Sequence, residues 1–401
     1  MPVEIADWND LDNVRNDLSG DYVLVNDLDS GTDGYAGIGD DFNPIGAGGN
    51  GFTGQLNGGS FEINNLVIDK PNETFVGLFA QLGTETSVGG SVFDLTVTAN
   101  VTGTGASFDE GTGVLAGTAR GDTQITNVVV EGEVSQPNGD FGAGGLVGIA
   151  RDEDTELKIE SCSSHVDVIA GSSERVGGIV GYFFDDSGGL VITDSYATGS
   201  VEGNDQVGGL VGLNTDTVTD SYATGSVEGN DQVGGLVGSS SGGTEIDSYW
   251  DTETTGQSTS DGSGTGLTTV EMQGSEAETN MDGFDFENVW STVEGNAETI
   301  NGQITLDDVA VETATVILHN FSELESTEVQ GDGYPILLSV DEDEQLESQD
   351  RVVRNIARTE TDTDGNYSAE IPGAAGDTIA IAVDFDDGTE RYGRVVTTVL
   401  E

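Results

Sequence analysis

The sequence predicts an all-β protein in which a parallel β-solenoid is followed by a smaller domain of alternating strands. Three observations carry this prediction: a glycine-rich unit repeats along the middle of the chain, Val, Ile and Thr recur throughout, and no 3.6-residue helical periodicity competes with the strand alternation. The 401 residues suffice for two or three domains that each bury a core.

The repeat is clearest at residues 194–212, where DSYATGSVEGNDQVGGLVG returns letter for letter at 220–238, 26 residues later. Weaker upstream copies end in the same way, so that glycines 117, 148, 181, 212 and 238 stand 31, 33, 31 and 26 residues apart. A unit of this length cannot bury an apolar face alone, so we expect the units to stack as coils. Glycine is expected where the chain turns between faces, either for a positive φ or for a close backbone approach.

The GGLVG pattern resembles the GLUG-motif proteins, and this resemblance implies a right-handed parallel β-helix of the kind found in bacterial and archaeal surface proteins. Residues 1–70, with WNDLDNVRNDLSGDYVLVNDLD and FTGQLNGG, resemble the N-terminal cap and first coils of that family. GLUG-type repeats then occupy residues 71–247. Residues 248–297, with SYWDTETTGQS and FDFENVW, resemble the segment that closes the helix.

Residues 298–401 follow a different pattern, in which alternating strands are separated by DG turns typical of β-hairpins. INGQITLDD and TDTDGNYSAEI resemble the immunoglobulin-like sandwiches related to carboxypeptidase regulatory domains. The resemblance implies a C-terminal Ig-like β-sandwich. Residues 331–354 depart from that pattern and are expected to form a long loop or an added edge strand.

The charge balance predicts a protein built for molar salt. Its 74 acidic and 11 basic residues give a formal charge of −63, and a Debye length of roughly 3 Å at 1 M salt removes most of the self-repulsion. Nucleic acid is excluded as a partner because phosphate binding needs clustered cations. The only lysines are Lys70 and Lys158, and the cluster Arg351, Arg354 and Arg358 is embedded among acids.

The N-terminus, MPVEIADWNDL, lacks the basic and apolar regions of a secretory signal, and no 18-residue apolar stretch occurs. As written, the chain is therefore expected to be neither exported by the usual signal nor inserted into a membrane. Cys162 is the only cysteine, which excludes an intrachain disulfide and a thiolate metal site.

No catalytic residue, metal ligand or cofactor is predicted. His165 and His319 each stand in a strand-like segment without a companion group. The acidic turn at residues 360–371 has Ile371 where an EF-hand needs a bidentate glutamate, and GAGGNG at 46–51 lacks the helix of a dinucleotide site. Both segments are interpreted as turns.

The candidate binding residues are four aromatic residues at corresponding repeat positions, Tyr196, Tyr222, Tyr249 and Trp250. An aromatic ladder of this kind binds sugars, or it packs as a stack along one face of the solenoid. Glycosylation is permitted at four sequons, at Asn72, Asn100, Asn320 and Asn366.

The first interpretation is a non-enzymatic structural or adhesive virion protein, a capsid turret, spike or tail fibre, of a virus that infects a halophilic archaeon. It combines surface-type domains with the missing signal, and it predicts localisation on the particle surface. Its partners would be other virion proteins, host surface glycan or S-layer, and itself as a homo-oligomer, a trimer first and a pentamer second.

Two alternatives remain open. One is a cell-surface adhesin of a haloarchaeon. The other is a glycan-cleaving β-helix enzyme, which needs only a pair of carboxylates, and 74 acidic residues leave that pair unspecified.

Overall fold

The structure is a computed structural model that describes residues 1–291, with gaps at 60, 85–87, 106–109, 138, 140, 153–156, 186–188 and 287–288, and beyond residue 297 only the strands named below. The chain divides into two compact units, Met1–Thr269 and Val270–Glu401. The division lies inside the predicted closing segment, residues 248–297.

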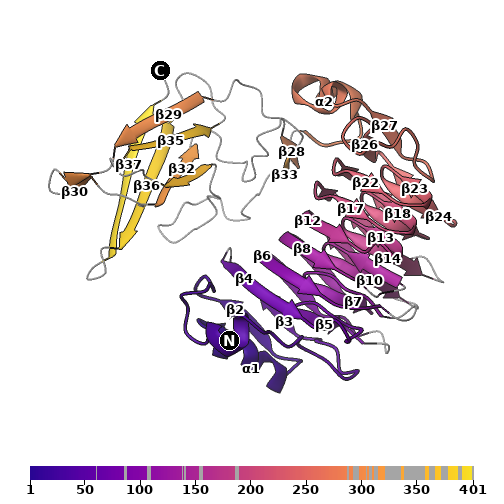
Figure 1. Cartoon of the computed structure of the whole chain (residues 1–401), viewed down its shortest axis with the longest axis horizontal. Coiled ribbons are helices and arrows are strands. Elements are labelled where there is room, and N and C mark those ends of the chain that lie inside the picture. The colour runs from indigo at the N-terminus through magenta and orange to yellow at the C-terminus, as the bar shows by residue number, and fades with distance from the viewer. Residues whose placement is uncertain are drawn as a thin grey trace. The chain divides into compact units, whose positions relative to one another are not determined.

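The first unit is a parallel β-solenoid with strands on three faces, so the prediction of an all-β solenoid is confirmed (Figure 1). Face one is a 17-stranded sheet: β1 (Val3–Ile5), β2 (Asp21–Leu24), β3 (Gln55–Asn57), β4 (Glu62–Asp69), β6 (Ser91–Thr102), β8 (Gln124–Ser135), β11 (Leu157–Glu160), β12 (Ser163–Ile169), β15 (Leu190–Thr193), β16 (Tyr196–Ala197), β17 (Val201–Glu202), β20 (Thr217–Thr219), β21 (Tyr222–Ala223), β22 (Val227–Glu228), β25 (Thr244–Ile246), β26 (Tyr249–Asp251) and β27 (Thr265–Leu267).

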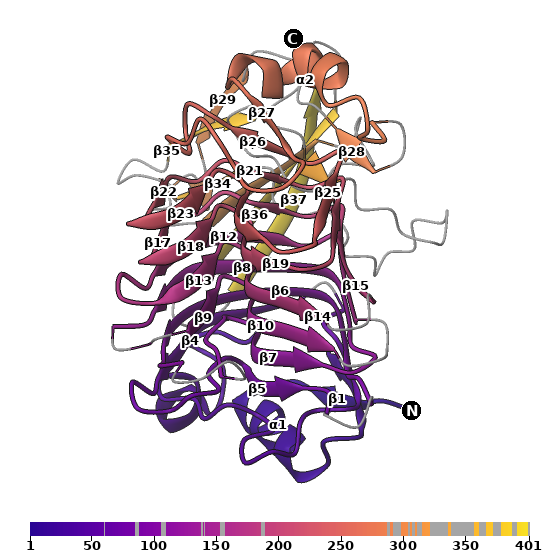
Figure 2. The same cartoon turned by 90° about the vertical axis from the view of Figure 1, so that its right-hand side faces the viewer.

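Faces two and three are shorter sheets that stack in the same direction (Figure 2). Face two has six strands: β5 (Phe79–Leu82), β7 (Ala116–Arg120), β10 (Val147–Asp152), β14 (Val180–Asp185), β19 (Val211–Asn214) and β24 (Val237–Ser240). Face three has four: β9 (Phe141–Gly144), β13 (Glu174–Gly177), β18 (Asp205–Gly208) and β23 (Asp231–Gly234).

Parallel stacking places one repeat position above the next, so the core is built from ladders of like residues. One ladder on face one runs through the paired positions Tyr22, Leu56, Val92, Ile125, Ile159, Ile192 and Val218. All of these side chains are buried. The next rung pairs Val218 with Glu245, so a carboxylate takes the apolar position in the last coil.

The corners between faces use left-handed backbone, but the repeat glycines do not supply it. Positive φ recurs once per coil at a corner of face one, at Asn65, Asp94, Asn127, Ser161, Asp194, Asp220 and Asp247. Asn and Asp tolerate this conformation because their short side chains hydrogen-bond locally. At the entry to face three the same φ occurs at Gly142, Arg175, Gln206 and Gln232.

The glycines of the GGLVG unit serve close approach instead. Gly209 and Gly212 are not among the positive-φ residues. A Cβ at Gly209 would overlap the carbonyl oxygen of Gly235 in the next coil, and one at Gly212 would overlap that of Gly181 in the preceding coil. The expected turn glycines are thus required by backbone contact between coils.

A short helix lies near the N-terminus, within residues 1–70, and the assignment of those residues to a cap and first coils stays a prediction. In α1 (Trp8–Asn13) the N-cap Asp7 accepts hydrogen bonds from the amides of Asn9 and Asp10. The Trp8 ring is fully buried and its Nε1 donates to the Asp29 carbonyl at 2.8 Å. A 3₁₀ turn (Val14–Asn16) and an irregular turn (Tyr35–Gly39) follow.

At the other end of the solenoid, β27 pairs with β26 on face one, whereas face two ends at β24 against side-chain oxygens of the following segment. Ser260 Oγ accepts from the amides of Leu236 (3.3 Å) and Val237 (2.8 Å), which have no following strand on face two. Asp261 Oδ2 accepts from the Ser240 amide at 2.9 Å. The first and last amides of β24 therefore have acceptors although the sheet ends there.

The second unit begins with a 3₁₀ turn (Val270–Met272) and α2 (Gly274–Asn280), and Phe284 stacks on Trp290 at 4.4 Å. Its remaining strands pair antiparallel: β28 (Trp290–Ser291) with β33 (Ile336–Leu337), β29 (Glu298–Gln303) with β35 (Asn366–Ile371), β30 (Thr305–Leu306) with β31 (Val309–Ala310), and a four-stranded sheet of β34 (Ala357–Glu360), β32 (Thr315–Asn320), β36 (Thr378–Asp386) and β37 (Arg391–Val399). Two sheets packed face to face are not established, so the sandwich stays a prediction. The acidic turn at residues 361–365 lies outside the described residues.

Candidate functional site

Three of the four candidate aromatic residues form one column on face one, and Trp250 lies at the neighbouring position. Tyr196, Tyr222 and Tyr249 are paired rung by rung. The rings of Tyr196 and Tyr222 stack at 5.0 Å with an interplanar angle of 6°, and His165 meets Tyr196 edge-on at 5.6 Å. The tyrosines therefore occupy one position on three consecutive coils, and the rings of the first two stack.

Burial decides how that column is interpreted. Tyr196 and Tyr222 are 0% exposed, Tyr249 is 4% exposed and Trp250 is 6% exposed. A sugar that stacks on an aromatic ring needs an open ring face, so this burial favours packing over binding, and sugar binding at these residues stays a prediction.

Trp250 lies in the core, at the rung position that Ala223 holds one coil earlier. Its Nε1 donates to the Gln257 carbonyl at 2.9 Å. A Cβ at Gly235 would overlap the indole ring, so the glycine makes room for it. The tryptophan therefore fills the end of the core under the closing segment.

The two histidines belong to different compact units of the chain. His165 lies on β12, where its Nδ1 is 2.8 Å from Thr198 Oγ1 in the next coil. His319 lies on β32 in the second unit, and its side chain is outside the described residues. The contact with Thr198 joins His165 to the next coil.

A second column runs along the face-one corner, directly after the left-handed residues. Ser195 Oγ accepts from the Cys162 amide at 3.1 Å and donates to the Thr193 carbonyl at 2.8 Å. Ser221 repeats both bonds one coil later. Each hydroxyl thus joins two coils and also closes its own corner.

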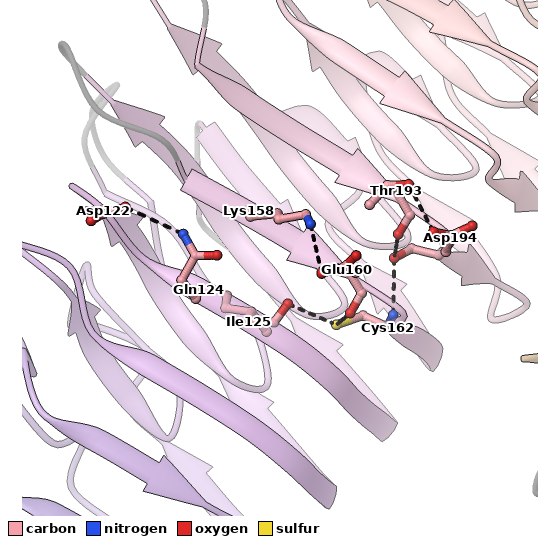
Figure 3. Close-up of polar contacts among 9 residues, drawn as sticks. Asp122, Gln124, Ile125, Lys158, Glu160, Cys162, Thr193 and Asp194 are labelled. Carbon is pink, nitrogen blue, oxygen red and sulfur yellow. Dashed lines mark hydrogen bonds and ion pairs between the residues drawn. The ribbon is translucent and has the colours of Figure 1, made fainter. Parts of the chain in front are cut away.

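Cys162 occupies the first position of this serine column. Its thiol is fully buried and lies 3.2 Å from the Glu160 carbonyl (Figure 3). Burial raises the pKa of Cys162 to about 12, so the thiol stays protonated at any physiological pH. The protonated thiol of Cys162 is therefore a poor nucleophile. The serine hydroxyls of the column link neighbouring coils.

The left-handed residues bring carboxylates together on consecutive rungs. Thr219 Oγ1 donates to Asp220 Oδ2 at 2.9 Å. Burial, with a smaller contribution from the charge of Asp247, raises the pKa of Asp220 above its ordinary value. Stacking Asp at this corner therefore supplies the left-handed turn at an electrostatic cost, which molar salt reduces.

The buried carboxylate Glu245 was not foreseen from the sequence. It is 3% exposed, and its Oε1 accepts from Asn214 Nδ2 (2.7 Å) and Ser240 Oγ (3.1 Å). Its Oε2 accepts from the Ser263 amide at 2.7 Å. The available signal was a charged residue in TEIDSYW where the preceding repeat has TVTDSYA, beside a Ser-rich segment.

Within the described ranges, no group of three or more His, Cys, Asp or Glu side chains is placed to hold a metal ion. No helix among those residues is both long and apolar enough to span a bilayer.

Comparison with known proteins identifies two similarities. Residues 203–228, which run from β18 across the corner to β22, match the GLUG motif, so the GLUG prediction is confirmed for that segment. The chain is also 34% identical over 269 residues to halomucin of Haloquadratum walsbyi, an alignment that covers 60% of this chain and 2% of halomucin. No solved structure matches the chain.

Proposed function

We propose that this chain is a non-enzymatic structural and adhesive module of a haloarchaeal cell surface, built around a GLUG-type β-solenoid. The observation that carries the proposal is the similarity to halomucin, whose name describes a mucin of a halophile. The chain spans only a small part of that relative, so the shared property is the solenoid segment and the surface role is our extension of it.

The composition supports a location outside the cell in concentrated salt. A formal charge of −63 keeps the molecule hydrated and dispersed, and molar salt screens the repulsion that would otherwise oppose folding. The two columns of the solenoid support a structural role, because their rings and thiol are buried and their hydroxyls form hydrogen bonds between coils.

The virion interpretation shares the same solenoid and differs in location. The similarity to a haloarchaeal protein favours the cell surface, so we place the virion component and its trimeric or pentameric assembly second. We also propose that the solenoid is right-handed and that residues 298–401 form an Ig-like sandwich, as the family resemblance implies.

Location is tested by fractionation. Antibodies raised against the purified chain are used for immunogold labelling of intact host cells, and for blotting of cell envelopes and of virus particles from the same culture. We expect the label on the cell surface and the band in the envelope fraction. A band confined to particles would replace this proposal by the virion one, and a band confined to cytosol would overturn both.

The enzyme alternative is tested separately, by incubating the whole chain in molar KCl with polysaccharide stripped from the host surface. We expect no release of reducing ends. Sustained release that disappears on heat denaturation would refute the non-enzymatic role.

A further inference from the structure

We propose that a cleft over the first strands of face two binds a neutral saccharide. The cleft has a volume of about 530 Å³, within the usual range of about 300 to 1,000 Å³ for small-molecule sites. It is remote from the aromatic column, because its floor belongs to β5 and β7.

The cleft exists because residues 46–51, a short segment of one coil, leave the sheet. Ile45 and Phe52 bridge to Phe79 and Leu82 of β5, but the six residues 46–51 between them bulge away. Positive φ at Gly46, Gly48 and Gly49 makes this excursion possible. The GAGGNG segment is thus a turn, as the sequence predicts, and it forms one wall of a hollow above β5.

Residues 72–75 also line the cleft, and its floor is polar. Gln81 on β5 and Arg120 on β7 both line the cleft although they are only 9% and 7% exposed. Phe75, which is half-buried, adds an aromatic ring. Burial restricts the rotamers of these two side chains, so that they can present an amide and a guanidinium in defined directions.

This lining fits a polyhydroxylated ligand. A sugar hydroxyl both donates and accepts, so it pairs with the Gln81 amide, with Arg120, and with the carboxylates of Glu73 and Glu110, which also line the cleft. Its apolar C–H face suits the ring of Phe75.

Charge selects a neutral sugar over an acidic one. The ionisable lining residues are two carboxylates and one guanidinium, and the chain as a whole carries −63. An anionic saccharide would meet both the local excess and the overall field. The proposal extends the surface function by naming the ligand class, and it stands or falls on binding rather than on location.

The test is titration calorimetry of the whole chain in molar KCl with neutral hexoses and N-acetylhexosamines, with their di- and trisaccharides, and with glucuronic acid for comparison. The blocking variant is Ala47→Trp, since Ala47 is exposed and lines the cleft. Its matched control is Ala36→Trp at another exposed alanine of the first coils. A second variant, Glu73→Gln at an exposed lining residue, keeps the test open should the tryptophan disturb folding.

We expect saturable binding of at least one neutral saccharide, weakened about tenfold or more in Ala47→Trp, weakened in Glu73→Gln, and unchanged in Ala36→Trp. Three results would overturn the proposal: no neutral saccharide binds the wild type, glucuronic acid alone binds, or Ala47→Trp and Glu73→Gln both bind as the wild type does. Failure of binding would leave the immunogold result intact, so the two proposals are separable.

Discussion

Replacing the buried carboxylate by its amide, Glu245→Gln, should weaken the C-terminal end of the solenoid. The carboxylate only accepts hydrogen bonds, and four donors converge on it: Asn214 Nδ2 of β19, Ser240 Oγ of β24, and the amide and hydroxyl of Ser263 in the closing segment. A glutamine side chain has the same shape, but one of its two polar ends is a donor. The substitution therefore changes hydrogen bonding and leaves the packing volume almost constant.

The loss of stability in Glu245→Gln depends on which end of the new amide, the oxygen or the NH₂ group, points toward Asn214 and Ser240. With the amide oxygen toward Asn214 and Ser240, the NH₂ group faces the Ser263 amide, and two donors oppose each other. With the amide reversed, the Asn214 donor loses its acceptor instead. Either orientation leaves buried donors unsatisfied at about 1 to 3 kcal/mol each, so we expect a loss of about 2 to 4 kcal/mol.

The assay is urea unfolding in molar KCl, followed by circular dichroism at a strand wavelength. The matched control is Glu228→Gln, because Glu228 is an exposed carboxylate on β22 and its replacement removes the same charge. Comparing the two variants cancels the general benefit of lowering a charge of −63.

Equal stability of Glu245→Gln and Glu228→Gln, within about 0.5 kcal/mol, would refute the reasoning. That result would mean that water or a rearranged closing segment satisfies the donors. A further variant, Glu245→Val, restores the residue type of the ladder at Val218 but removes the acceptor of Asn214 Nδ2, Ser240 Oγ and the Ser263 amide. It is therefore expected to be at least as damaging as the glutamine.

Three further outcomes are expected. Because the folded chain holds the proton of Asp220 more tightly than the unfolded chain does, its contribution to stability falls as pH rises from its ordinary pKa of 3.8 through its raised pKa. Asp220→Asn suits the left-handed φ of 48° and should raise the thermal midpoint at pH 7 but not below pH 3.8. A higher midpoint that persists below pH 3.8 would refute the raised pKa of Asp220. The Cys162 thiol should resist a thiol reagent in the native state and react only on unfolding, as followed by absorbance, whereas rapid native labelling would contradict its burial. Ser260 Oγ covers the last edge of face two, and Ser263 Oγ bonds the backbone of Glu245 on β25 of face one. The double variant Ser260→Ala, Ser263→Ala should expose both edges and associate with rising concentration in light scattering, unlike the exposed-site control Ser241→Ala. A monodisperse double variant would show that the hydroxyls do not protect these edges.

The sequence by itself determined the architecture of the solenoid, because a parallel stack repeats one chemical position on every rung. Two identical copies of DSYATGSVEGNDQVGGLVG predict that Val207 and Val233 pair, and so do Tyr196 and Tyr222, as the structure has them. The strand alternation and the missing helical period decide the all-β class in the same local way.

Tertiary structure decided what those positions do. Whether the tyrosines face solvent depends on what packs over them, and that is a contact between distant segments. The repeat glycines were explained by turns as readily as by close approach, until the neighbouring coil's carbonyl oxygens occupied the space of a Cβ.

The cleft and the buried Glu245 both occur where the repeat is broken. The cleft forms because residues 46–51 leave the sheet, and Glu245 is satisfied because Ser263 returns across the end of the last coil. A repeat pattern states which residues share a rung, but it contains no information about how an irregular segment folds back over the stack. Only the three-dimensional path of the chain supplies it.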